Sequence, residues 1–467
     1  MSSWYWARNW TAYPGFFPSG LGALGLPLTL YSNAYASPAD GNSFPPGFDW
    51  EVSSSGNFGG IPNWAIVPAS QALDFYNLLL DRGVGMWGQN ALEIDFINFL
   101  VLGSTQFNTD ARALGEYWGG VNAASAAHGV STQMCMDLPL MALSSVQWSH
   151  VTNARLQGDG FPSDTQRYDI GLPSLLYSAL HLAPFLDVVW STACQNSTDN
   201  AFHGECEPDV EALAATAALS AGAVGFGDGL GHTNASLVNM TCRADGVILG
   251  PSSPATPLDM WFWGALEPWG RRARVSCAPT SLPSASGASA TWLALHAVFL
   301  DPAASAAPLV VRPCDTSPPL GDGAAFWVTA LAPGGAGALA RACADGAPAA
   351  ACAAPFSAAA PLAILTGADR HELYSIAPVL PGGWALLGEL AKFVRVSPAR
   401  FGTASGGGGA LNATLSGAPG EAIAVTLITP GALVRSVPVV FGPSGSALLA
   451  CAGSECTVTA TQASPRA

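Results

Sequence analysis

Over the first 275 or so residues, short apolar runs alternate with helix-length stretches. The spacing is typical of βα units. Eight candidate strands can be placed: Ser3–Ala7, Leu28–Ser32, Trp64–Val67, Ala91–Phe96, Thr132–Met136, Ala154–Gln157, Asp187–Ser191 and Gly222–Phe226. An amphipathic helix is predicted over Ser70–Arg82. The pattern predicts an α/β fold, a (β/α)8 TIM barrel whose active site lies at the C-terminal strand ends.

The amino-acid composition changes beyond about residue 285, where Ala, Gly, Pro, Val and Thr dominate. Strand-like runs occur at Thr291–Phe299 and Ala424–Ile428, and the run Gly402–Gly409 is predicted to be a flexible loop. We therefore expect a C-terminal all-β, sandwich-like domain. The expected organisation is a barrel over residues 1–275 and a β-sandwich over residues 285–467, and 467 residues suffice for both.

Charge limits the classes of partner. The formal net charge is −15, and only 10% of residues are charged. An acidic surface argues against nucleic acid and against anionic membranes. The longest apolar run, around Leu175–Trp190, contains His181, Pro184 and Asp187, so no membrane insertion is expected.

Ten cysteines are present, and none has the C-x-x-C spacing of a zinc site. Three pairs bracket polar loops: Cys194 with Cys206, Cys343 with Cys352, and Cys451 with Cys456. Close pairs of this kind predict disulfides of an oxidising compartment, and free buried thiols are the alternative.

Five N-x-S/T sequons point to the same compartment: Asn9, Asn196, Asn234, Asn239 and Asn412. We expect a protein of the secretory pathway, extracellular or vacuolar/lysosomal. Met1 leads directly into Ser-Ser-Trp-Tyr-Trp without a signal-peptide pattern. We therefore expect that the start of the sequence is trimmed or incomplete.

The first candidate for chemistry is Asp95, at the end of the run Ala91–Phe96. Strand side chains alternate, so Glu93 and Asp95 are expected to point the same way, into the barrel mouth. Burying a carboxylate near the end of an apolar strand costs free energy, so such a residue is expected to have a function. The alternative is a structural carboxylate that accepts hydrogen bonds from loop amides.

The second candidate is Asp159, which follows Arg155 and lies between Gly158 and Gly160. The two glycines allow a sharp turn close to a ligand, and Arg155 can pair with a carboxylate or bind sugar hydroxyls. A solvated ion pair at a surface turn is the alternative. Asp95 and Asp159 are two βα units apart, on one barrel face, and glycoside hydrolysis needs two such carboxylates.

At these residues the chain resembles the α-galactosidase clan of glycoside hydrolases, most closely family 36 with its raffinose-synthase-like members. Arg155-Leu-Gln-Gly-Asp159 is similar to the clan's R-x-x-x-D, whose Asp is the acid/base, and Glu93-Ile-Asp95 to its K-x-D, whose Asp is the nucleophile. Residues 221–232 and 243–249 are similar to the last strand and loop of raffinose-synthase-like proteins. Glu93 stands where the family has a Lys that contacts the sugar.

The resemblance implies a retaining α-glycosidase that cleaves terminal α-linked sugars from an oligosaccharide or α-glycoside, with Asp95 as nucleophile and Asp159 as acid/base. Neither metal nor cofactor is needed. The residues expected to bind substrate are Trp4, Trp6, Tyr31, Trp87, Glu93, Asp137, Arg155 and Asp228. For the aromatic residues core packing is the alternative, and for Asp137 and Asp228 loop capping is. The competing functions are a raffinose-synthase-type galactosyltransferase, a non-catalytic carbohydrate-binding protein and a structural cell-wall protein.

Overall fold

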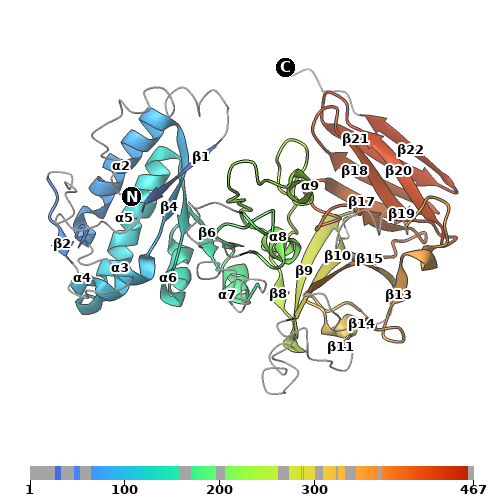
Figure 1. The fold of residues 1–467 in the computed structure, drawn as a ribbon, viewed down its shortest axis with the longest axis horizontal. Helices are drawn as coiled ribbons and strands as arrows, with labels where there is room; N and C mark the ends of the chain where they lie inside the picture. Colours follow the sequence, from blue (N-terminus) through green and yellow to red (C-terminus); the bar gives the residue numbers. More distant parts are fainter. Residues whose placement is uncertain are drawn as a thin grey trace. The chain divides into compact units, whose positions relative to one another are not determined.

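The structure is a computed structural model. It describes residues 27–32, 47–52, 65–156, 170–171, 173–195, 206–260, 273–284, 287, 289–299, 309–321, 324–331, 343–364 and 371–460. The chain divides into two compact units, which Figure 1 shows in sequence colours. Unit 1 comprises residues 1–158 and 179–183, and unit 2 comprises residues 159–178 and 184–467. Residues 285–467 lie in unit 2, which also holds residues 184–284.

A five-stranded parallel sheet has the order β1-β4-β5-β6-β7, and its first four strands lie in unit 1. The strands are β1 (Leu28–Ser32), β4 (Gln89–Ile94), β5 (Ser131–Met134), β6 (Val151–Arg155) and β7 (Ala183–Phe185). Consecutive partners β1–β4, β4–β5 and β5–β6 run parallel. Parallel strands need crossover connections, and helices of unit 1 lie in the sequence between β1 and β4, between β4 and β5, and between β5 and β6.

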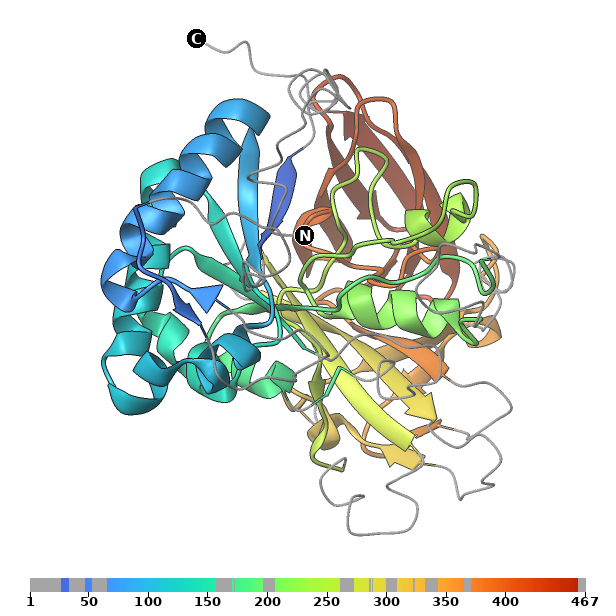
Figure 2. The same cartoon turned by 60° about the vertical axis from the view of Figure 1, so that its left-hand side comes forward.

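Two long helices cover one face of this sheet, as Figure 2 shows. Phe75 and Leu79 recur at helical spacing in α2 (Ala72–Trp87) and are buried, so the helix predicted over Ser70–Arg82 is confirmed. This helix and α5 (Ala113–His128) both end at a glycine with a left-handed backbone. The smaller elements of unit 1 are β2 (Glu51–Val52), β3 (Ala65–Ile66), η5 (Ala69–Gln71), α3 (Ile97–Gly103), α4 (Thr105–Thr109), α6 (Pro139–Ser144) and η6 (Ser145–Gln147). Helix α7 (Pro173–Ala179) lies in unit 2 except for its last residue.

The predicted (β/α)8 barrel is wrong, because the parallel sheet of the described residues has five strands and does not close. The runs at Leu28, Ala91, Thr132 and Ala154 do form parallel strands. The run at Trp64–Val67 instead contributes β3, which pairs antiparallel with β2. The run Gly222–Phe226 contributes only an isolated parallel bridge from Phe226 to Val189. The expected first strand, Ser3–Ala7, lies outside the described residues.

Antiparallel sheets dominate unit 2. The largest has the order β13-β12-β15-β10-β9-β8. Its strands are β8 (Thr256–Pro257), β9 (Ala273–Pro283), β10 (Ser289–Phe299), β12 (Phe326–Leu331), β13 (Ala354–Phe356) and β15 (His371–Pro378). Helix α8 (Val210–Leu219) packs Leu213 and Ala217 against Val298 of β10. The smaller elements are α9 (Ala235–Asn239), β11 (Leu309–Val311), β14 (Leu362–Ile364), η8 (Pro313–Asp315) and η9 (Ala349–Ala351).

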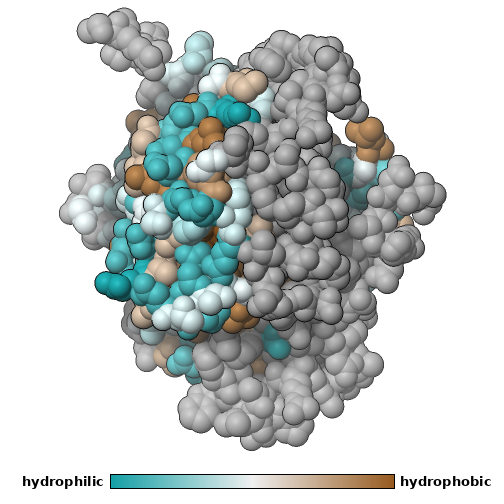
Figure 3. Space-filling view, turned by 90° about the vertical axis from the view of Figure 1, so that its left-hand side faces the viewer, coloured by the Kyte–Doolittle hydropathy of each residue, from teal (hydrophilic) through white to brown (hydrophobic). Residues whose placement is uncertain are grey.

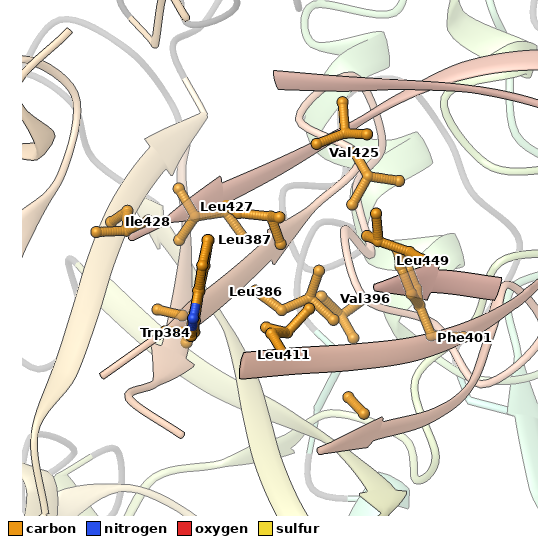
Figure 4. Packing of buried hydrophobic residues seen from close by; sticks show 14 of the residues in the cluster. Trp384, Leu386, Leu387, Val396, Phe401, Leu411, Val425, Leu427, Ile428 and Leu449 are labelled. Atoms are coloured by element: carbon orange, nitrogen blue, oxygen red, sulfur yellow. The ribbon is translucent and has the colours of Figure 1, made fainter. Parts of the chain in front are cut away.

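Two further antiparallel sheets share one hydrophobic core, drawn in Figure 4. One sheet has the order β16-β19-β20, with β16 (Ala385–Gly388), β19 (Ala422–Ile428) and β20 (Val434–Val440). The other has the order β17-β18-β21-β22, with β17 (Phe401–Gly407), β18 (Ala410–Ser416), β21 (Ser446–Ala452) and β22 (Glu455–Ala460). Leu386 and Leu427 from the first sheet meet Leu411 and Leu449 from the second. The two sheets therefore form a β-sandwich.

The glycine run Gly402–Gly409 is not the flexible loop that its composition predicts. Most of it belongs to β17, which pairs with β18. Only Gly408 and Gly409 form the hairpin turn, and both have positive φ, which such a turn requires. Phe401 and Ala404 anchor the strand because both are fully buried in the sandwich core.

All three predicted cysteine pairs form disulfides. Of the sequon asparagines, Asn234, Asn239 and Asn412 are exposed, whereas Asn9 and Asn196 lie outside the described residues. In the view of Figure 3, apolar residues stand in small groups among hydrophilic ones on the part of the surface that is described. Within that part of the chain, no helix is long and apolar enough to cross a membrane.

Candidate functional site

The parallel sheet of unit 1 carries a polar row across four strands. Tyr31 is the Cα partner of Glu93, and Glu93 is the partner of Gln133. Gln133 is paired with Asn153, whose Nδ2 donates a hydrogen bond of 2.7 Å to Gln133 Oε1. Paired residues of neighbouring strands project to the same face of a sheet, so these four side chains form what we call the first polar row.

A second polar row lies two residues further along three of these strands, at Asp95, Cys135 and Arg155. The ladder of backbone hydrogen bonds reaches this level, because the Asp95 N–H donates to Ser32 O at 2.9 Å. All three residues are buried, with Asp95 6% and Arg155 4% exposed. A carboxylate and a guanidinium are thus both withdrawn from water at the C-terminal ends of parallel strands, where α/β sheets bind ligands.

Both oxygens of the Asp95 carboxylate accept short hydrogen bonds. The Tyr31 hydroxyl donates to Oδ2 at 2.6 Å, and the Phe96 N–H donates to Oδ1 at 2.6 Å. The Cys135 thiol forms a further contact with the carboxylate. These donors fix the orientation of the carboxylate, a requirement for a group that attacks a substrate in one direction.

The groups around Asp95 keep their protons at neutral pH. Burial, then the hydrogen bond to Asp95, raises the pKa of the Tyr31 hydroxyl far above its usual range. Burial also raises the pKa of the Cys135 thiol strongly; the positive charge of Arg155 opposes this and the carboxylate of Asp95 adds to it. Tyr31 and Cys135 are therefore hydrogen-bond donors to the carboxylate rather than competing anions.

The backbone is strained at the same place. Phe96 follows Asp95 with φ 57°, and Met136 follows Cys135 with φ 52°. A left-handed backbone is unfavourable for such bulky residues and costs roughly 1–3 kcal/mol. Two such residues at neighbouring strand ends, each next to a residue of the second polar row, are typical of a functional site.

The other predicted residues that the structure describes do not belong to either polar row. Trp87 is the last residue of α2 and is buried, and Asp137 lies two residues beyond Cys135. Asp228 belongs to unit 2. Its Oδ1 accepts hydrogen bonds from Ser191 N at 2.8 Å and Gln195 Nε2 at 2.7 Å, and its Oδ2 accepts one from Ser191 Oγ at 2.6 Å. Such bonds are typical of a loop-capping carboxylate.

Three predicted residues, Trp4, Trp6 and Asp159, lie outside the described residues. The sequence did not single out Gln133 and Asn153 as members of the site. The signal was present, because Gln133–Cys135 and Asn153–Arg155 repeat the two-residue spacing of Glu93–Asp95. Which strands are neighbours decides whether such pairs meet.

Within the described ranges, no group of three or more His, Cys, Asp or Glu side chains is arranged to hold a metal ion. No protein-family model matches the chain. A search of curated proteins also finds no match.

Proposed function

We propose that the protein is a retaining α-glycoside hydrolase of the α-galactosidase type, with Asp95 as its nucleophile. The observation that carries the proposal is the buried Asp95 carboxylate, which is held by Tyr31 and the Phe96 amide and flanked by strained strand ends. The similarity of Glu93-Ile-Asp95 and Arg155-Leu-Gln-Gly-Asp159 to the motifs of the α-galactosidase clan supports it.

The mechanism needs a pair of carboxyl groups. Asp95 attacks the anomeric carbon and forms a covalent glycosyl-enzyme, while Asp159 donates a proton to the departing oxygen. Asp159, now a carboxylate, takes a proton from water, which attacks the anomeric carbon and releases the sugar and Asp95. In the sequence, Asp159 follows Arg155, the last residue of β6, by four residues.

The first polar row supplies the groups that recognise sugar hydroxyls. Glu93 offers an acceptor, and the amides of Gln133 and Asn153 offer both donors and acceptors. Arg155 adds a donor from the second row. Trp4 and Trp6 are the aromatic residues proposed to stack on the apolar face of the sugar ring.

A second candidate is transfer of the sugar to another sugar, as in raffinose synthase. The similarity of residues 221–249 to raffinose-synthase-like proteins favours it. The two reactions share the glycosyl-enzyme and differ in whether water or a sugar hydroxyl attacks it. Product analysis with and without sucrose as acceptor separates them.

We place the protein in the secretory pathway, extracellular or vacuolar/lysosomal. The disulfides and the exposed sequons Asn234, Asn239 and Asn412 support this location.

The test is turnover of aryl α-galactosides, α-glucosides and α-N-acetylgalactosaminides by the wild type and by Asp95→Asn and Asp159→Asn. Both substitutions are expected to lower kcat by roughly a thousandfold or more. Asp81→Asn is the matched control, because this carboxylate is exposed on α2 and is expected to leave kcat unchanged. Azide should restore turnover of Asp95→Ala by replacing the lost nucleophile. Full activity in Asp95→Asn would refute the proposal.

A further inference from the structure

Unit 2 contains a hollow of about 540 Å³, well away in sequence from Asp95. It lies between the segment that follows α9 and the sheet that contains β19, and its size is that of small-molecule sites, roughly 300–1,000 Å³. Its charged lining consists of Arg243, Glu389, Lys392 and Glu421, and its apolar lining includes Ala422, Ile423 and Ala424.

The charged wall is held from behind by Arg400, which is fully buried. Its Nη2 and Nη1 donate to the two oxygens of Glu421 at 2.6 and 2.9 Å, and its Nε donates to Glu389 Oε1 at 2.6 Å. The amides of Ala244 and Ala418 also donate to Glu421. Glu421 is thus saturated with donors, and the wall is preorganised.

Glu389 and Lys392 remain able to bind a ligand. Among the described residues, Glu389 Oε2 forms no hydrogen bond, and burial raises the pKa of this carboxyl while Arg400 opposes the rise. The ammonium of Lys392 donates to Asn239 O and, at 2.7 Å, to Cys242 O. An ammonium has three donors, so a third is left over.

Lys392 is also the only lysine in the sequence, where all sixteen other Lys or Arg positions hold Arg. A composition this biased towards Arg makes a single lysine informative. An ammonium is a compact point charge on a flexible stem, whereas a guanidinium is a broad planar fork. The hollow therefore holds the one position of the chain at which the smaller cation is used.

We propose that this hollow binds a neutral, polyhydroxylated small molecule of about the size of a hexose. The two cations and two anions of the lining cancel, so neither a free anion nor a free cation is favoured. A hydroxyl group accepts from Lys392 and donates to Glu389, and the apolar lining suits the C–H face of a sugar or cyclitol. The proposal does not depend on the activity assigned to Asp95.

Two side chains of the hollow report on its occupancy in the unmodified protein. Lys392 is the only lysine for amine reagents, and Cys242 is a free, half-buried thiol. The exposed free thiol of Cys314 is an internal control outside the lining. Rates of reductive methylation at Lys392 and of iodoacetamide alkylation at Cys242 and Cys314 are measured by peptide mass spectrometry. Galactose, glucose or myo-inositol is added, with sodium acetate and ammonium chloride as ionic probes.

A polyol is expected to slow modification of Lys392 and Cys242 severalfold and to leave Cys314 unchanged. Lys392→Met is expected to abolish the protection of Cys242, and Asp95→Asn to preserve it. If the Cys242 thiol does not react in the free protein, the wild-type rates at Lys392 decide. The proposal is overturned if no polyol protects either group, if Cys314 is protected equally, or if only the ionic probes protect.

Discussion

At the scale of single residues, the site depends on how one carboxylate is held. Asp95 is anchored through both oxygens, by the Tyr31 hydroxyl and by the Phe96 amide, and the Cys135 thiol contacts the carboxylate as well. The sequence predicts that Asp95 and Glu93 share a face, because alternation is a local property of a strand. It does not predict the bond to Tyr31, which depends on β1 pairing with β4 across sixty residues of chain.

Tyr31→Phe removes the hydroxyl that donates to Asp95 and keeps the aromatic ring. A hydrogen bond to a charged group contributes about 1.5–3 kcal/mol, so kcat/KM on an aryl α-glycoside should fall by roughly 10- to 100-fold. The matched control is Tyr76→Phe, which removes a buried hydroxyl that contacts Tyr117 at 3.2 Å. Equal activity in the wild type and in Tyr31→Phe would show that the hydroxyl does not position Asp95.

His296 makes the stability of unit 2 sensitive to acid. Burial, then the nearby His371, lowers its pKa to about 3, and its Nε2 has no hydrogen-bond partner among the described residues. Below about pH 6.5 the His296 imidazole is protonated in the unfolded chain but stays neutral in the folded chain. Stability is therefore complete above pH 6.5 and falls by about 1.4 kcal/mol per pH unit as the pH drops towards 3.

Urea unfolding between pH 7 and pH 4 measures this loss. His296→Leu is expected to flatten the acid slope and to leave stability at pH 7 unchanged or higher. His232→Gln, on the loop after Gly231, is the matched control and should keep the wild-type slope. An unaltered slope in His296→Leu would assign the acid sensitivity to other groups.

At the scale of elements, a buried ion network joins the turns around the sandwich. Arg400 precedes β17, Glu389 follows β16 and Glu421 precedes β19. The guanidinium also lies 5.2 Å from the ring centroid of Phe441. Each charge is tolerable only because its partners are present, since an unpaired buried charge is strongly destabilising.

Arg400→Met leaves two buried carboxylates without their partner and should lower the free energy of unfolding by about 3–5 kcal/mol. Arg435→Met is the control, because its ion pair with Asp345 is largely exposed and such pairs contribute about 0–1 kcal/mol. Urea titration of both variants at pH 7 makes the comparison. Similar losses in the two variants would contradict the role assigned to the network.

The sequence predicts elements better than it predicts their partners. Helix α2 and strands β4, β10 and β19 follow from local periodicity and form as expected. The barrel does not form because closure depends on which strand edges meet, and β3 uses its edge on β2. The glycines of β17 predict a loop where the structure has a strand. Burial of Phe401 and pairing with β18 outweigh the flexibility of these glycines.

In the molecule as a whole, the three disulfides and the exposed sequons are both typical of a protein that passes through the secretory pathway. Asn412 lies in β18, and Asn234 caps α9 through Oδ1, which leaves its Nδ2 available for a glycan. Protein secreted from a eukaryotic host should carry N-glycans at Asn234, Asn239 or Asn412, located by glycopeptide mass spectrometry. Asn412→Gln should remove the glycan of that site alone. Efficient secretion with all three asparagines unmodified would contradict the exposure seen here.

The proposed nucleophile Asp95 forms a covalent bond to the sugar, and trapping that bond is the decisive test of its role. The protein is incubated with 2-deoxy-2-fluoro or 5-fluoro α-glycosyl fluorides of the sugar series used for turnover, and its peptides are examined by mass spectrometry. We expect one fluoroglycosyl group per chain, attached to Asp95, and none in Asp95→Asn. A label on another residue, or no label on a protein that hydrolyses the aryl glycosides, would contradict this role of Asp95.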